Sequence, residues 1–218
     1  MGEPLLEVTL LTLRVSLSAT LIATLIGLPA GAFLAAASKR VRAFATPILS
    51  ALMGLPPVVV GLGVYLLLSR SGPLGGLGVL YTPTAMVIAQ SLLVIPIVTV
   101  LTKEHVEEFL LANAEQLRSM GARNLGIIFT ALFQVRFTLT TVVLAGAGRA
   151  FAEVGAVLMV GGNIEGETRV LTTTIATETG KGELTLALWF GGLLMVIVLA
   201  ANLAATMLRR RASRRYGL

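Results

Sequence analysis

The chain has 218 residues, of which 56% are hydrophobic and 13% are charged, whereas soluble domains carry about 25% charged residues. The net charge is +6, but the basic residues sit at the ends of apolar runs, which favours an explanation by membrane topology over nucleic-acid binding. The absence of cysteine excludes disulfides, zinc–thiolate sites, iron–sulfur clusters and cysteine nucleophiles. Composition therefore indicates an all-α, polytopic membrane protein with one transmembrane domain over residues 1–218.

The N-terminal segment is not expected to be a cleavable signal, because Glu3 and Glu7 stand where a signal peptide would be basic. A membrane-spanning helix takes roughly 20 mostly apolar residues. Five segments meet this need, and we expect spans over 12–37, 45–68, 81–101, 137–160 and 184–208. Prolines inside the second and third spans predict kinks at Pro56–Pro57 and at Pro96.

The orientation follows from lysines and arginines in the loops, which are enriched on the cytoplasmic side. Loop 39–42 carries three such residues, segment 103–136 four and the C-terminal tail five, while the opposite side receives only Arg70, Arg169 and Lys181. We therefore expect a multi-pass protein of the cell (inner) membrane, with its N-terminus outside and its C-terminus in the cytoplasm. Without the span over 137–160, the long basic loop and the basic tail would lie on opposite faces, which supports keeping that span.

The long loop over 103–136 predicts an amphipathic helix on the cytoplasmic side. Its apolar residues recur at spacings of three and four, with glutamates filling much of the remainder, up to a break or C-cap at Gly121. Residues 115–121 read Glu-Gln-Leu-Arg-Ser-Met-Gly. This stretch resembles the Glu-Ala-Ala, three residues, Gly signature of ABC importer permeases, whose loop forms a coupling helix that docks on the ATPase subunit. The resemblance implies that role for Glu115, Gln116, Leu117 and Gly121, although Gln116 and Leu117 replace the two alanines and the family's later Ile-x-Leu-Pro is absent.

A second stretch is similar to a narrower branch of these permeases. Residues 148–156 read Gly-Arg-Ala-Phe-Ala-Glu-Val-Gly-Ala, residues 159–164 read Met-Val-Gly-Gly-Asn-Ile, and residues 168–173 read Thr-Arg-Val-Leu-Thr-Thr. These three stretches resemble permeases of the molybdate and tungstate type, and are most similar to the tungstate members. The resemblance implies the ABC type I importer permease fold and a pore for tungstate or molybdate. It further implies a homodimer, an extracytoplasmic oxyanion-binding protein, and ATPase subunits that bind ATP and magnesium in place of this chain, which has no cofactor of its own.

Two charges fall inside the fourth span. Arg149 and Glu153 are four residues apart and share one helical face. Charges within a membrane usually face a bundle interior or a wet cavity. The two are either a structural ion pair or part of an anion pathway, in which Glu153 holds Arg149 in place. Further along the chain, Asn163, Thr168, Arg169 and Thr172 either guide an oxyanion at the outer end of the pore or are ordinary polar loop residues.

The sequence offers little for catalysis. No Gly-Lys-Ser/Thr phosphate loop is present, so the chain should not bind ATP, and the single histidine, His105, has no partner set for a metal. We therefore expect a pore subunit and not an enzyme. Three alternatives stay open: a permease for sulfate, phosphate, methionine or another small solute, a carrier driven by ion gradients, and a membrane-bound enzyme or scaffold.

Overall fold

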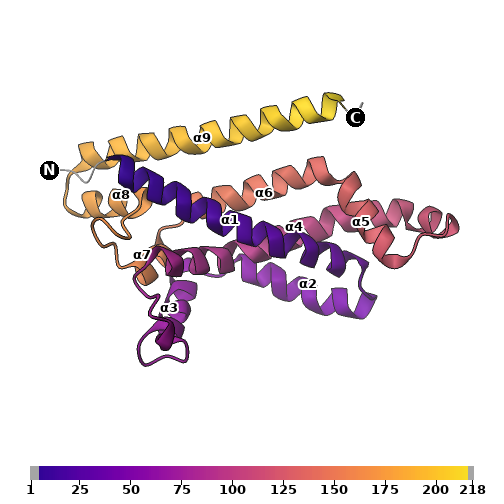
Figure 1. Cartoon of the computed structure of the whole chain (residues 1–218), viewed down its shortest axis with the longest axis horizontal. Helices are drawn as coiled ribbons and strands as arrows, with labels where there is room; N and C mark the ends of the chain where they lie inside the picture. The colour runs from indigo at the N-terminus through magenta and orange to yellow at the C-terminus, as the bar shows by residue number, and fades with distance from the viewer. Residues whose placement is uncertain (1–4, 216–218) are drawn as a thin grey trace.

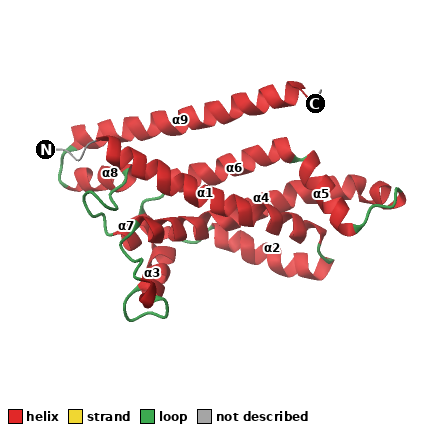
Figure 2. Ribbon diagram, viewed as in Figure 1, coloured by secondary structure: helices red, strands yellow, loops and turns green. Residues whose placement is uncertain are grey.

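The computed structural model describes residues 5–215, and side chains as far as Met207 with the exception of Ala205. All regular secondary structure within this range is helical (Figures 1 and 2). The helices are α1 (Leu5–Ala36), α2 (Lys39–Met53), α3 (Pro57–Leu68), α4 (Pro83–Ser119), α5 (Asn124–Gln134), α6 (Arg136–Phe151), α7 (Gly155–Gly161), α8 (Leu171–Gly180) and α9 (Leu184–Arg215), with a 3-10 turn at Gly75–Leu77. The expected all-α fold is therefore confirmed.

The centre of the molecule is the pair formed by α1 and α4, which run side by side over much of their lengths. Their close approach requires small residues on α1. A Cβ atom added to Gly31 would lie 2.5 Å from the Thr99 carbonyl oxygen of α4, and one added to Gly27 would lie 2.8 Å from the Val98 Cβ. Around this pair, the buried apolar side chains of the described chain form three clusters spread along its length. Small residues that let helix backbones approach are the usual means of packing helices in lipid.

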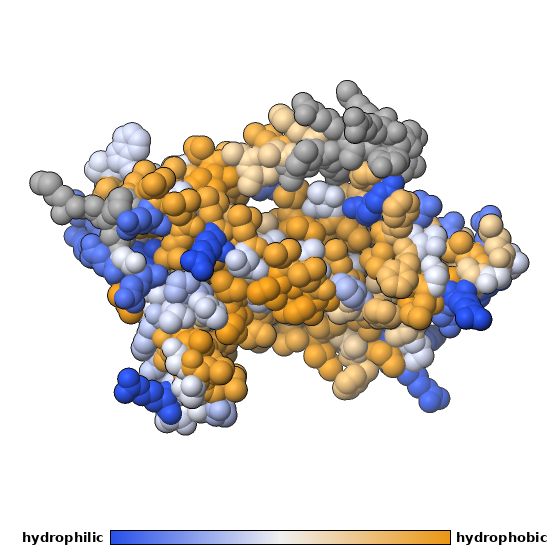
Figure 3. Space-filling model, viewed as in Figure 1, coloured by the Kyte–Doolittle hydropathy of each residue, from blue (hydrophilic) through white to orange (hydrophobic). Residues whose placement is uncertain are grey.

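Three helices, α1, α4 and α9, are long and apolar enough to cross a membrane. Two bent pairs, α2 with α3 and α5 with α6, raise the number of possible crossings to five if each pair counts as one. The five expected crossings agree with this upper number, although the fourth then runs over 124–151 and not over the expected 137–160. Hydrophobic side chains cover the middle of the molecule in Figure 3, and hydrophilic ones gather toward its ends, as a membrane-embedded protein requires.

The expected span over 45–68 is not one straight helix. Helix α2 ends at Met53, α3 begins at Pro57, and the two meet at 97°. Proline fixes its own φ and keeps the preceding residue out of the helical region, so Pro56–Pro57 ends one helix and opens the next. The kink predicted there is thus a complete break. At the second predicted position, α4 continues through Pro96 without ending.

The expected span over 137–160 is also divided. Helix α6 ends at Phe151 and α7 begins at Gly155. The expected loop over 103–136 is mostly helical: its first part continues α4 to Ser119, so the third span and the amphipathic segment are one helix of 37 residues. Its second part is α5, which the sequence analysis did not anticipate. Helix α8 was not anticipated either.

The three basic segments of the sequence lie at one end of the molecule, which we call the basic end (Figure 1). It holds the junction between α1 and α2, the turn between α4 and α5, and the last turns of α9. This arrangement agrees with the number of crossings inferred from the charge distribution. Helix α9 lies along the side of the bundle, against α8 and α6, and most of it is exposed.

Two glycines of α3 provide a test of the packing between α3 and α7. A Cβ atom added to Gly61 would lie 2.7 Å from the Ala156 Cα of α7, whereas one added to Gly63 meets nothing within 4 Å. We expect Gly61→Ala to destabilise the protein by about 1–3 kcal/mol, as overpacking usually does. Gly63→Ala should be neutral or slightly stabilising, because alanine favours helix by roughly 0.5–1 kcal/mol. Thermal unfolding of both variants in lipid discs measures this difference, and equal melting temperatures would contradict the packing described here.

Candidate functional site

The break between α6 and α7 is built around the Arg149–Glu153 ion pair. Arg149 lies in the last turn of α6, and its Nη1 donates to the Glu153 Oε2 at 2.5 Å. The other carboxylate oxygen of Glu153 accepts a hydrogen bond from the Ala156 backbone N–H at 2.8 Å, in the first turn of α7. Glu153 is 2% exposed, while Arg149 is 28% exposed. The carboxylate therefore joins both helices at the break, and the guanidinium is the accessible end of the pair.

Two other helices hold the same break. The Thr172 hydroxyl of α8 donates to the Glu153 carbonyl at 2.9 Å, and the Gln90 amide of α4 donates to the Ala150 carbonyl at 3.1 Å. These bonds engage backbone oxygens where the helical ladder is interrupted. Gln90 is buried, and its side-chain oxygen has no hydrogen-bond partner. Gln90 was not among the predicted site residues, although a single amide inside an apolar span is itself a signal.

The segment after α7 is a tight loop closed by Thr168. Gly162 and Asn163 both have positive φ, of 71° and 51°, so the chain reverses there. The buried Thr168 hydroxyl donates to the Gly161 carbonyl and accepts from the Ile164 N–H. Thr168 and Thr172 are thus buried, and their hydroxyls are hydrogen-bonded within the fold. The Asn163 amide donates to Thr177 of α8 at 2.8 Å, while its oxygen is buried without a partner.

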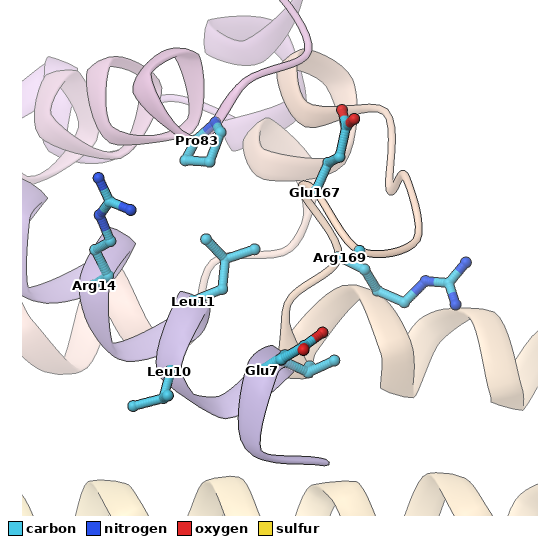
Figure 4. A pocket seen from close by; sticks show the side chains of 9 residues that line it. Glu7, Leu10, Leu11, Arg14, Pro83, Glu167 and Arg169 are labelled. Atoms are coloured by element: carbon cyan, nitrogen blue, oxygen red, sulfur yellow. The ribbon is translucent and has the colours of Figure 1, made fainter. Parts of the chain in front are cut away.

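Arg169 borders a cleft of about 350 Å³ between the start of α1, the start of α4 and the loop after α7. Figure 4 shows the Arg14 side chain directed toward Pro83, while the Arg169 guanidinium is turned away from Arg14. Arg169 pairs with Glu165 at 3.3 Å. Because Glu7 and Glu167 also line this cleft, its charge is mixed and not purely basic. Arg169 therefore lies beside the starts of α1 and α4. Among the described residues it forms no hydrogen bond with Arg149 or Glu153.

At the basic end, α4 ends in a defined turn. Gly121 has a φ of 84°, its N–H donates to the Arg118 carbonyl, and the Ala122 N–H donates to the Leu117 carbonyl. These two bonds, with a glycine in the left-handed region just past the cap, form a Schellman motif. The break predicted at Gly121 is therefore confirmed, and its cause is backbone geometry. Glu115 and Gln116 are exposed and Leu117 is half-buried, so this turn presents polar side chains to its surroundings.

The turn also exposes apolar side chains and borders a second cleft. Met120 is 76% exposed and Leu125, in the first turn of α5, is 58% exposed. A cleft of about 500 Å³ lies between the ends of α1 and α4 and the start of α5. Polar side chains from α2, α4 and α5 line it together with apolar ones: Arg42, Glu107, Glu115, Arg118 and Asn124. The turn itself, where Met120 and Leu125 are exposed beside Glu115 and Arg118, mixes apolar and charged groups and is suited to docking another protein.

The candidate residues thus form two separate groups. Arg149, Glu153 and Thr172 meet at the break between α6 and α7, and the loop with Asn163 and Thr168 follows directly. Glu115, Gln116, Leu117 and Gly121 lie at the basic end, joined to the rest of the fold by α4 (Figure 1). A function that uses both groups must transmit movement along the helix bundle.

Comparison with known proteins gives consistent matches. The model of the family described as binding-protein-dependent transport system inner membrane component matches residues 27–215. The chain is 40% identical to the tungstate uptake system permease protein TupB of Peptoclostridium acidaminophilum over 193 residues, which is 88% of this chain and 84% of that protein. It is 34% identical to a probable anion ABC transporter permease protein of Haloferax volcanii, covering 98% of this chain and 94% of the relative. The TupB of Campylobacter jejuni is also 34% identical, over 78% of this chain and 72% of that protein.

Proposed function

Because this chain belongs to the family of binding-protein-dependent transport system inner membrane components, we propose that it is the pore-forming permease subunit of an ATP-driven importer for tungstate, with molybdate as the close second substrate. One observation carries the choice of substrate: the 40% identity to a tungstate uptake permease over 88% of the chain. Relatives named for molybdenum and sulfate transport are less similar, at 26% identity for the first and 29–30% for the second.

The same proposal assigns the partners. Two copies of the chain form the pore, two ATPase subunits dock at the basic end, and an extracytoplasmic binding protein delivers the oxyanion at the opposite end. The basic end is then cytoplasmic, as the excess of lysine and arginine in its loops favours. In this arrangement ATP and magnesium are bound by the ATPase subunits.

Helix α4 is suited to transmit the movement of the ATPase. It has 37 residues and, at 1.5 Å per residue, a length of about 55 Å, well beyond the roughly 30 Å of the hydrocarbon core. Its last turns carry Glu115, Gln116 and Leu117, and the Schellman turn at Gly121 fixes the direction in which the chain leaves it. We assign these residues to contact with the ATPase.

The anion pathway is assigned to the break between α6 and α7. Arg149 is more than a quarter exposed, and its hydrogen bonds in the described structure run through Nη1 alone. A guanidinium has five N–H donors, so this side chain can bind an oxyanion while Glu153 holds it in place. Asn163, Thr168, Arg169 and Thr172 support this region by fixing the loop after α7 and its junction with α8, and Thr172 also bonds to the Glu153 carbonyl at the break itself.

The test is ATP hydrolysis by the assembled complex in lipid discs. The chain is co-purified with its ATPase subunit, and binding protein loaded with tungstate, molybdate or sulfate is added. We expect tungstate-loaded protein to stimulate hydrolysis most, molybdate-loaded protein to follow, and sulfate-loaded protein to have little effect. If only sulfate-loaded binding protein stimulated ATP hydrolysis, the substrate would be sulfate and not tungstate. Failure of any ATPase to assemble, with uptake that persists in its absence, would replace this proposal with a gradient-driven carrier.

A further inference from the structure

The Glu107 carboxylate of α4 lies between two cations at the basic end. Its Oε1 pairs with the Arg42 Nη1 of α2 at 2.5 Å, and its Oε2 pairs with the Lys103 Nζ one turn earlier on α4, also at 2.5 Å. All three side chains are partly buried, with exposures between 13% and 28%. Both carboxylate oxygens are thus engaged. The bond to Arg42 joins α4 to α2, between two residues that are 65 positions apart in the sequence.

The contact with Arg42 extends to a third helix. The Arg42 Nη1 also donates to the Ala35 carbonyl at 3.4 Å, in the last turn of α1, where backbone oxygens lack helical partners. Glu107 therefore connects the end of α1 and the start of α2 to α4 through one guanidinium. We call this set of contacts between Glu107, Arg42, Lys103 and the Ala35 carbonyl the Glu107 clamp.

An apolar cluster supports the clamp. Val106, next to Glu107 in sequence, is fully buried against Ala32 and Ala35 of α1 and against Ile128 and Ala131 of α5. This cluster packs α5 and the last turns of α4 onto the end of α1. Helix α2 also packs against α4, but none of its residues is fully buried, and the clamp joins it to both α4 and the end of α1 through one charged side chain.

We propose that Glu107 is a positioning residue that makes α1, α2 and the α4–α5 turn move as one body when the ATPase displaces that turn. This inference rests on the proposed function. The residues assigned to the ATPase contact begin at Glu115, about two turns beyond Glu107 on the same helix, and end at Gly121, just past the end of α4. Force applied there reaches α4 directly, and it reaches α2 through the clamp and through the half-buried contacts between α2 and α4. Without the clamp, hydrolysis continues while α2 follows α4 less closely, because only their half-buried contacts remain.

The location of the clamp makes the proposal testable. All three charged side chains keep some exposure to solvent, and glutamine preserves the shape and hydrogen-bonding oxygen of Glu107, so removing its charge should leave a folded chain and affect coupling instead. The matched control is Glu108, which is adjacent on α4, exposed, and in no ion pair described here. Glu107→Gln and Glu108→Gln are compared in the assembled complex, and the number of oxyanions imported is measured per ATP hydrolysed.

For Glu107→Gln we expect a fall of about tenfold in anions imported per ATP, a size typical of coupling between distant sites, with ATP hydrolysis near the wild-type rate. Glu108→Gln should keep the wild-type ratio. If the wild-type complex imports and Glu107→Gln imports as many anions per ATP as wild type, the proposed role of the clamp is wrong and the proposed function still stands. A wild-type complex that imports no oxyanion refutes the proposed function and the clamp with it.

A second variant guards against misfolding of the first. The chain has no cysteine, so in the purified chain, before the partner subunits are added, Arg42→Cys with Glu107→Cys can be joined selectively by a short bis-methanethiosulfonate, which forms a disulfide at each thiol and releases methanesulfinate. Linked protein should import with the wild-type ratio, and the same protein before linking should show the reduced ratio. A link that blocks import would mean that α2 and α4 separate during transport. Equal ratios before and after linking would mean that the attachment is irrelevant. Either result overturns the proposal.

Discussion

A chain that carries Gly121→Val is expected to lose its ATPase subunit on co-purification and to import no oxyanion. Gly121 has a φ of 84°, a region in which a β-branched residue is strongly disfavoured. A left-handed conformation costs an ordinary L-residue about 1–2 kcal/mol, and the branched side chain adds to that. The chain must then abandon the two hydrogen bonds that close the turn after α4. Because the turn sets the path from α4 to α5, its loss displaces the whole docking surface.

Gly126 provides the matched control for this prediction. It lies in α5, close to Gly121 in sequence, is exposed, and like Gly121 has nothing within 4 Å of an added Cβ, but its φ is not positive. Gly126→Val should therefore bind the ATPase as wild type does. Co-purification and ATP hydrolysis in lipid discs measure both variants. ATPase binding that is equal in the two would show that the left-handed turn is not needed for docking.

Much of the fold follows from local features of the sequence. Apolar runs predict the crossings, the charge bias places the basic segments at one end, and Gly121 marks the end of α4 because only a left-handed residue closes that turn. The breaks were harder to place. Pro56–Pro57 predicts a kink, but the 97° angle depends on how α3 packs against α7, which the local sequence does not contain.

The sites were less predictable, because their bonds are made between distant segments. The spacing of Arg149 and Glu153 predicts that the two share a helical face, but α6 ends between them and the helix break itself, not a face, brings them together. Glu153 was expected to hold Arg149, and its second role as the acceptor for the Ala156 N–H at the start of α7 was not foreseen. Gln90 and the Glu107–Arg42 contact link residues 60 and 65 positions apart. Only the tertiary structure reveals such pairs.

Removing Arg149 is expected to have the largest effect on stability. Arg149→Met keeps most of the side-chain volume but leaves the Glu153 carboxylate, which is 2% exposed, without its counter-charge. Breaking a buried pair in this way costs about 3–5 kcal/mol, and we expect the lower end of that range because Arg149 is itself partly exposed. Glu153→Gln should cost less, since glutamine still accepts the Ala156 N–H and the remaining guanidinium is accessible to solvent. Thermal unfolding in lipid discs measures both single variants.

The double variant, Arg149→Met with Glu153→Gln, separates stability from transport. It buries no unpaired charge, so its stability should return to about that of Glu153→Gln alone, and the two changes should be strongly non-additive. Import should nevertheless stay lost, because the guanidinium assigned to the anion pathway is missing. A double variant that is stable and imports normally would reduce the pair to a structural brace for the break between α6 and α7. Persistent loss of import in a stable chain would place Arg149 in the path of the anion, since the folding defect would then have been removed.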